Sequence, residues 1–486
     1  MLGRKERSQL ERFIAGSLRE LVPDDHVMAR VDRVLDLSRL HEEVADLYCA
    51  DNGRPGIDPE AAVRLMLPGF LLGIVHDRRW MREAQVNLAI RWFAGYALHE
   101  TLPDHSTLTR IRQRWGAQRF RRIFERSVQA CVAAKIAKGE IVHVDASLIR
   151  ADVSWESLVA RHVEAVDEAN REQVQASKAS RSTGKFKKIC KTDPHASMAT
   201  NGRNRRLEPA YKQHAVVDDL RGVVLDVEVT TGEVNEGQVI VERLDATMAV
   251  TGTAIGTATA DAGYAYGKVF GALERRGIDP VIPAKVEPIR SKVPLRRFRY
   301  DARHDILKCP RGRALRPTRR IEHGRFFYSR AADCARCDLA SLCLSKGRAN
   351  KAVVVSDEHP ALLRARRRRE KWSDEDRRLH QRHRWRSEGF HGEAKAWHGL
   401  ARAVRRGFAN VKIQAYLTAV AINLKRLAAA ILALIRLSYR RILQHRAIFA
   451  RSGGWQGIAL VAPRFLLVRS HDLAFSTAPR SNAAAA

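Results

Sequence analysis

The change in hydrophobic pattern near Glu140 constrains this fold more than any other feature. Up to about residue 135, apolar residues recur at helical spacing. From Glu140 the run IVHVDASLI is apolar and rich in β-branched residues before it ends in polar positions. This pattern predicts a buried strand with Asp145 near its exit. The chain should therefore place an all-helical unit before an α/β unit.

The segments after this strand follow a recognisable order. A charged helical piece and a polar basic loop, which we expect to lie along DNA, occupy residues 155 to 210. The runs YKQHAVVDD and GVVLDVEVTTG are then separated by a turn at 218–222, which suits a hairpin. A helix at 236–248 and a strand, helix, strand series up to 284 complete the layout of an RNase-H-like mixed sheet. In that fold the first and fourth strands are neighbours, so Asp145 and Asp261 would meet at the strand ends.

The whole chain divides into five expected units. The length of 486 residues is too great for one ordinary core. We expect a helical N-terminal unit over 1–135, the first part of the α/β core over 140–284, a cysteine-rich insertion over 285–355, the last part of the core over 356–436, and a tail over 437–486.

The charge of the chain indicates a polyanionic partner. There are 86 Lys and Arg against 54 Asp and Glu, giving a formal net charge of +32. Such a field attracts nucleic acid. The run PDHSTLTRIRQRWG, with Arg110 and Arg112, is consistent with a helix that reads DNA; a surface helix with solvated arginines is the alternative.

A membrane partner is not expected. The longest apolar run, 427–435, is short, and the approach to it is broken by Asn423, Lys425 and Arg426, so no stretch of about 20 uncharged residues exists. The N-terminal run MLGRKERSQLERF lacks the apolar core of a secretory signal. We therefore expect a cytoplasmic protein.

The cysteines fall into two groups. Seven cysteines, an odd number without an export signal, argue against a disulfide framework, and three of them are scattered, namely Cys49, Cys131 and Cys190. Four are grouped in KCPRG and CARCDLASLC, namely Cys309, Cys334, Cys337 and Cys343. Thiolates at such spacing suit a structural Zn²⁺ in a small β-rich knuckle, with reduced thiols packed in an insert as the alternative.

The run RWRSEGFHGEAK places a carboxylate inside a basic helix. Arg384, Glu388 and Lys395 are spaced to share one helix face. With Asp145 and Asp261, Glu388 would supply the hard oxygen ligands for two Mg²⁺ ions, with Mn²⁺ as a substitute, and two such ions suit phosphodiester chemistry. Taken singly, each acid also fits a cap or a surface charge. Four competing acids, Asp152, Asp226, Glu228 and Glu393, lie nearby. Asp152 ranks lower because the loop after the first strand would have to fold back, and Glu393 because it is about 140° around the helix from Glu388.

At these residues the sequence resembles bacterial insertion-sequence transposases of the DDE type, over nearly all of residues 15 to 430. The similar motifs are LVPDDHVMARVDRVLDLSRL, NGRPGIDPEAAVRLMLPGFLLGI and LPDHSTLTRIRQRW in the helical part, then VHVDASLIRADVS, TDPHASM, YKQHAVVD and TADAGYAYGKV. Arg384, Glu388 and Lys395 match the signature around the catalytic Glu. The tyrosine expected three residues before Arg384 is Gln381 here, which affects the usual tyrosine contact and not metal binding.

This resemblance implies a function. Asp145, Asp261 and Glu388 would be the metal-binding catalytic triad, and Arg384 and Lys395 would contact DNA near the scissile end. Further DNA contacts are expected from the arginines of two helical segments, Arg110, Arg112, Arg405 and Arg406. Proteins of this type bind their element's terminal inverted repeats, cut there and join the 3′-ends to target DNA, as a homodimer or larger complex at the nucleoid. The alternatives are a catalytically inactive DNA-binding regulator and an RNase-H-like nuclease that does not join ends.

Overall fold

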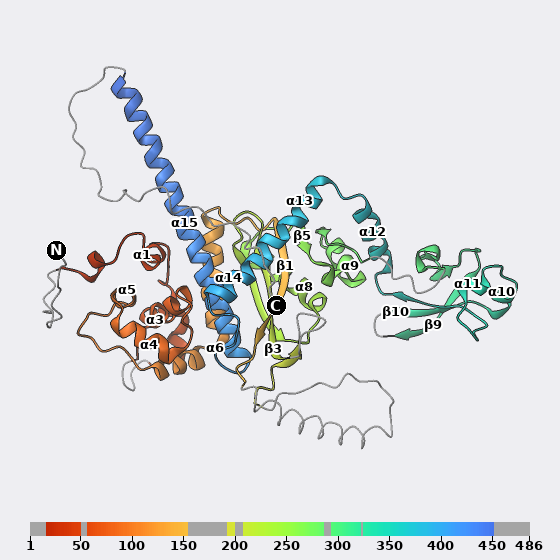
Figure 1. The fold of residues 1–486 in the computed structure, drawn as a ribbon, viewed down its shortest axis with the longest axis horizontal. Helices are drawn as coiled ribbons and strands as arrows, with labels where there is room; N and C mark the ends of the chain where they lie inside the picture. The colour runs from red at the N-terminus through yellow and green to blue at the C-terminus, as the bar shows by residue number, and fades with distance from the viewer. Residues whose placement is uncertain are drawn as a thin grey trace, which may run out of the picture.

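The computed structural model describes residues 16–49, 56–153, 192–199, 208–285, 293–321 and 324–451. The charged helical piece and most of the basic loop expected after residue 155 lie outside these residues, as does the chain from 452 onward. Figure 1 shows a group of N-terminal helices, a central sheet with its helices, and a small insertion set apart at the far end. The expected α/β fold with a helical N-terminal region is confirmed.

The N-terminal region is helical throughout its described part. Asp58 caps α3 by accepting a hydrogen bond from Ala61 N at 2.8 Å, and Asp104 caps α6 by accepting one from Ser106 N at 2.8 Å. Gly116 interrupts α6 with a φ of 65°, a conformation that glycine adopts without strain. The elements are η1 (Leu18–Leu21), α1 (Val27–Asp32), α2 (Leu40–Val44), η2 (Ala45–Leu47), α3 (Pro59–Leu71), α4 (Asp77–Val86), α5 (Leu88–Ala94) and α6 (His105–Ala133).

The central sheet has six strands. Strands β2 and β4 pair with β3, β3 pairs antiparallel with β1, β1 pairs parallel with β5, and β5 pairs parallel with β6. The expected neighbourhood of the first strand and the strand before Asp261 is therefore confirmed. The elements are β1 (Ile141–Arg150), β2 (Ser197–Ala199), β3 (Glu208–Asp218), β4 (Val224–Thr231), α8 (Glu236–Thr251), β5 (Thr257–Ala260), η3 (Ala262–Tyr264), α9 (Gly267–Arg275) and β6 (Asp279–Val281).

One detail of the first strand differs from expectation. Asp145 was expected near the strand exit, but β1 continues to Arg150 because β3 pairs with it along this whole length. Only the pairing with β5 ends at Val144. Asp145 thus lies at the point where β1 loses one neighbour and keeps the other.

The long helix α15 (Phe408–Arg451) packs against α6 and β4. Asn423 fits this apolar helix because its side chain accepts a hydrogen bond from Val224 N and donates one to Val224 O, both at 2.9 Å. The helix runs past residue 436, where the last part of the core was expected to end. In the described part of the chain, α15 is the one helix long and apolar enough to span a membrane, and half of its most apolar stretch is buried inside the protein.

The insertion has its own five-stranded sheet and small core. Its buried side chains form a cluster of their own, separate from the main core. This cluster includes Phe298, Leu307, Leu315 and Phe327. The elements are η4 (Leu295–Arg297), β7 (Arg299–Asp301), β8 (Ile306–Lys308), β9 (Ala314–Ile321), β10 (Gly324–Tyr328), α10 (Ala331–Ala335), α11 (Ala340–Cys343) and β11 (Ala352–Ser356).

A helical run returns the chain from the insertion to the sheet. It comprises α12 (His359–Glu370), α13 (Asp374–His383), η5 (Arg384–Glu388) and α14 (Gly389–Trp397), and η5 is a π-helical turn. A buried polar chain holds α13 to the sheet, since Thr259 Oγ1 of β5 hydrogen-bonds His143 Nδ1 at 2.6 Å and His383 Nδ1 at 3.1 Å. The position of Glu388 therefore depends on contacts made by the turn before it.

Candidate active site

Two aspartates lie side by side at the centre of the sheet. Val144 of β1 pairs with Ala260 of β5 in parallel register, and Asp145 and Asp261 are the next residues of each chain segment. Asp145 Oδ1 accepts a hydrogen bond from Ala146 N at 2.8 Å, and Asp261 Oδ1 accepts one from Gly263 N at 2.7 Å as the cap of η3. Local backbone donors thus orient both carboxylates.

Glu388 is the last residue of η5, and it lies close enough to Asp145 for its charge to act on that carboxylate. Its side chain is 62% exposed and forms an ion pair with Arg384, whose Nε lies 3.2 Å from Glu388 Oε2. The helical face expected for Arg384 and Glu388 is therefore present, although a π-turn forms it. Such turns are frequent at functional sites.

The charges of these acids act on one another. Burial, together with the negative charges of Asp261, Glu236 and Glu388, raises the pKa of Asp145 to about 7. A bound cation would favour the ionised form, which is the form that ligates a hard divalent metal. This donor set fits such an ion. Within the described residues, no three acidic, His or Cys side chains are already arranged as a closed metal shell, so binding would require the carboxylates to draw together.

Helix α14 lies directly against β1. Lys395 Nζ donates a hydrogen bond to Ser147 Oγ at 2.5 Å. One turn after Glu388, the buried His391 places Nε2 3.9 Å from Asp145 Oδ2, and neither of its ring nitrogens has a hydrogen-bond partner. The helix that carries Glu388 therefore borders the Asp145 carboxylate along two successive turns.

The competing acids are occupied elsewhere. Glu393 is held by Lys425 and Arg426 of α15, each at 3.0 Å, and these cations and His398 lower its pKa to about 2. Two others, Asp226 and Glu228, pair with basic side chains that include Arg121, Arg243 and Lys412. Asp152 lies beyond the last residue of β1. This geometry favours Asp145, Asp261 and Glu388 over the four alternatives.

Two of the arginines expected to contact DNA have internal partners. The Arg112 side chain is only 3% exposed and forms an ion pair with Asp77, which also pairs with Arg405. These internal partners speak against a DNA contact by Arg112 or Arg405, because the shared Asp77 directs both guanidinium groups into the protein. Arg110 and Arg406 are exposed. An arginine's burial depends on partners from distant segments, so its spacing in a helix could not reveal it.

Three residues on the elements that carry or adjoin the acids were not anticipated. Trp385 and Trp397, at the two ends of the Glu388 helix, are 74% and 71% exposed. The third is Glu236, in the first turn of α8. Glu236 follows the capping Asn235, and a lone acid at that place carries no sequence signal beyond that of a helix start.

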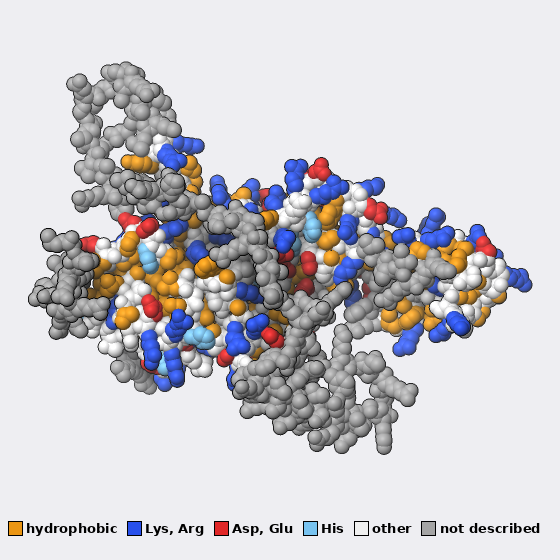
Figure 2. All heavy atoms as spheres, viewed as in Figure 1, with side chains coloured by type: hydrophobic (Ala, Val, Ile, Leu, Met, Phe, Trp, Pro, Cys, Tyr) orange, Lys and Arg blue, Asp and Glu red, His pale blue; other side chains and the backbone are white. Residues whose placement is uncertain are grey.

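Lys and Arg side chains gather over α12 and α13 in Figure 2.

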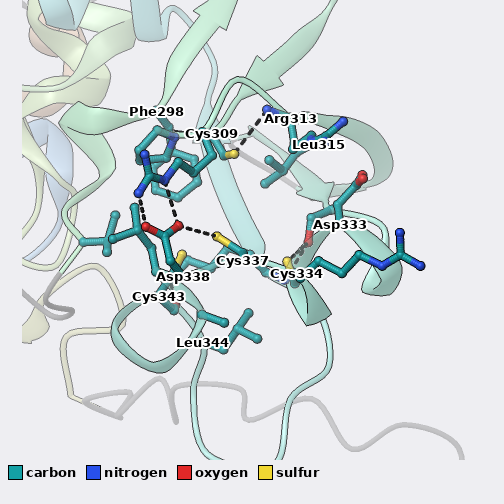
Figure 3. Close-up of a pocket in the computed structure, with 18 of the residues that line it drawn as sticks. Phe298, Cys309, Arg313, Leu315, Asp333, Cys334, Cys337, Asp338, Cys343 and Leu344 are labelled. Atoms are coloured by element: carbon teal, nitrogen blue, oxygen red, sulfur yellow. Dashed lines mark hydrogen bonds and ion pairs between the residues drawn. The ribbon is translucent and has the colours of Figure 1, made fainter.

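The four grouped cysteines line one pocket in the insertion (Figure 3). Arg313 N donates a hydrogen bond to Cys309 Sγ at 3.3 Å, and Ser329 Oγ lies 3.0 Å from Cys334 Sγ. Burial raises the pKa of Cys343, and the other three cysteines contribute to that shift. The six cysteines in the described residues are all free. The segments KCPRG and CARCDLASLC are thus brought to a single place.

Two family models match the chain. Residues 16–114 match a transposase domain (DUF772), and residues 184–424 match a transposase DDE domain. The second match includes Asp261 and Glu388, whereas Asp145 lies between the two matched ranges. No curated protein matches the chain. Together the two matches include the helical N-terminal region up to the first part of α6, the sheet apart from β1, and the helix that carries Glu388.

Proposed function

This chain belongs to the DDE transposases of insertion sequences, and on that premise we propose that it binds the terminal inverted repeats of its own element, cuts the DNA there and joins the freed 3′-ends to target DNA. The observation that carries the proposal is the adjacency of Asp145 and Asp261, which follow the last parallel pair of β1 and β5, Val144 and Ala260. Water is the nucleophile in cleavage, and the 3′-hydroxyl that cleavage frees is the nucleophile in strand transfer.

Asp145, Asp261 and Glu388 would hold the divalent ions, with Mg²⁺ as the natural ion and Mn²⁺ as a substitute. When bound, such ions would lower the pKa of the attacking water or 3′-hydroxyl and stabilise the negative charge on the leaving oxygen. The two aspartates are fixed by the sheet and by backbone donors, so they set the position of the reacting phosphate. The exposed Glu388 can adjust to it from the helix. The carboxylates stay acceptors throughout, and no side chain is required as the base.

The basic residues near these acids would hold the DNA. Arg384 is highly exposed and now pairs with Glu388, so it is free to exchange that carboxylate for a phosphate. Lys395 reaches the same region from the next turns of the helix. Arg406 and Arg110 are exposed and would contact the backbone farther away.

The cleavage test uses purified protein and a linear duplex that bears the element's end. We expect Asp145→Asn, Asp261→Asn or Glu388→Gln to abolish Mg²⁺-dependent cutting while mobility shifts show end binding within a few-fold of wild type. Glu242→Gln is the matched control, because Glu242 is 74% exposed on the outside of α8. Cutting that survives any of the three substitutions would refute the assignment.

The same assay separates the other candidate functions. A regulator derived from a transposase would shift the duplex without cutting it, and a plain nuclease would cut without producing a joined product. The three acids are all present here, which speaks against the regulator; the joined product decides between the transposase and the nuclease.

The insertion would bind a structural Zn²⁺ through Cys309, Cys334, Cys337 and Cys343. Their common pocket and the N–H donor to Cys309 Sγ support this, because thiolate ligands are stabilised by backbone donors. The insertion's separate core is small, and a metal would stabilise a unit of that size.

Two DNA ends must be paired before they are joined to one target, so we propose that the chain acts as a homodimer on DNA in the cytoplasm, at the nucleoid. Light scattering of the protein with and without the end duplex tests this: the expected complex contains two chains, and a complex with one chain and one duplex would contradict it.

A further inference from the structure

Glu236 and Asp261 face the same small volume above Gly263. A methyl group built on Gly263 would lie 2.7 Å from Asp261 Oδ1 and 3.0 Å from Glu236 Oε2. The two carboxylates come from different elements, since Glu236 begins α8 and Asp261 follows β5. Two like charges that close repel each other unless a cation lies between them. The arrangement therefore calls for a positive partner.

A buried hydroxyl beside these acids also lacks a partner. Tyr264 is fully buried, and its hydroxyl oxygen has no hydrogen-bond partner. Burial raises the pKa of Tyr264 well above its usual value, and the charges of Asp145, Glu236 and Asp261 add to the shift. All three carboxylates are therefore close enough for their charges to act on the phenol. Buried polar groups are normally hydrogen-bonded, so this one indicates a rearrangement or a ligand at the site.

Among the described residues, Lys212 is the one cation paired with Glu236, so a single positive charge stands beside the Glu236 and Asp261 carboxylates. Lys212 Nζ lies 3.4 Å from Glu236 Oε1, and the same Nζ donates a hydrogen bond to Val234 O at 2.9 Å. Glu236 also adds to the raised pKa of Asp145, so its charge reaches the centre of the site. A structural explanation exists as well, because an acid in the first turn of a helix stabilises the helix dipole.

We propose that Glu236 is a fourth carboxylate of the active site and holds a divalent cation together with Asp261. The inference rests on the proposed function, because it concerns the same metal site. It assigns to α8 a part in metal binding that the three expected acids do not include. Closure of Glu236 and Asp261 on one ion would also bring an acceptor toward the Tyr264 hydroxyl.

The test measures binding of Mn²⁺ to the full chain without DNA, by the electron paramagnetic resonance signal of free Mn²⁺. We expect Glu236→Gln to weaken Mn²⁺ binding by about ten-fold or more, whereas Glu242→Gln on the same helix leaves it unchanged. Glu236→Asp keeps the charge and should recover binding to within a few-fold. In metal-free buffer Glu236→Gln should melt at the wild-type temperature or above, because a repulsive charge is removed.

The outcomes separate this inference from the function on which it rests. If Glu236→Gln binds Mn²⁺ as wild type does while Asp261→Asn does not, the inference fails and the three-acid site stands. A lower melting temperature of metal-free Glu236→Gln, together with unchanged Mn²⁺ binding, would likewise assign Glu236 to the helix start. If wild type binds no Mn²⁺, or if Asp145→Asn still cuts, both proposals fail.

Discussion

Lys395 Nζ donates a hydrogen bond to Ser147 Oγ at 2.5 Å, and this contact joins the helix that carries Glu388 to the strand that carries Asp145. Burial lowers the pKa of Lys395, and the negative charge of Asp145 opposes that shift. A half-buried cation at this point can hold the helix in place and can also meet a phosphate. The two roles can be separated by experiment.

Lys395→Ala should weaken end binding and lower the salt slope of binding by about 1, because one phosphate contact is lost. Ser147→Ala removes the hydroxyl partner but keeps the charge, so its salt slope should equal that of wild type. Mobility shifts over a range of salt concentrations measure both. An unchanged slope for Lys395→Ala would remove the proposed contact.

Glu393→Gln should affect stability rather than cutting. It would leave Lys425 and Arg426 without their carboxylate, at a cost of about 3 kcal/mol in the free energy of unfolding. The matched change Glu388→Gln should cost little stability, because Glu388 is exposed. Urea unfolding of both variants provides the comparison, and equal stabilities would contradict the assignment of Glu393 to packing.

The Glu393 cluster also predicts a pH dependence. The folded pKa of Glu393 is about 2 and its usual value is 4.5, so the folded state binds fewer protons between these values. The stability from this carboxylate is fully present above pH 4.5 and is lost as the pH falls toward 2. Wild type should therefore lose more unfolding free energy than Glu393→Gln between pH 6 and pH 3.5; identical losses would argue against the lowered pKa.

Arg112→Ala should destabilise the protein by about 3–5 kcal/mol, because Arg112 is buried against Asp77. Arg110→Ala, two residues earlier and exposed, should change stability by less than about 0.5 kcal/mol and should act on DNA affinity instead. Thermal melts and mobility shifts of the pair test this. A stable Arg112→Ala variant with weakened DNA binding would restore Arg112 as a DNA contact.

Purified protein should contain one Zn²⁺ per chain, and replacing Cys334 and Cys337 with Ser should remove it. Loss of the metal is expected to destabilise the insertion without unfolding the main core, since the two hydrophobic clusters are separate. Elemental analysis with limited proteolysis of the insertion checks this. Zinc content that is unaffected by the double change would reject the cluster.

The strand order was predictable from the sequence, and the contacts of individual charged residues were not. Alternating and β-branched runs around Asp145, followed by a hairpin and a helix, leave few topologies for the sheet, so the adjacency of Asp145 and Asp261 follows from local patterns. The burial of Arg112 depends on Asp77 of another helix. Glu236 meets Asp261 only because α8 begins where β5 ends in space, and that proximity has no signature in the residues themselves.

The π-turn of η5 contains one residue more than a regular helix would need there. Upstream, His383 fastens the run to β5, and downstream, Lys395 and Glu393 fasten it to β1 and α15. Since each residue of an α-helix adds about 100° of rotation, deleting one residue from 384–388 would straighten the helix and turn its two halves out of phase. The contacts of either His383 or of Lys395 and Glu393 would then be lost, because those side chains would face solvent. Insertions and deletions should therefore be tolerated far less here than in the surface loops, and a regular α-helix over 384–388 would fit the sheet less well.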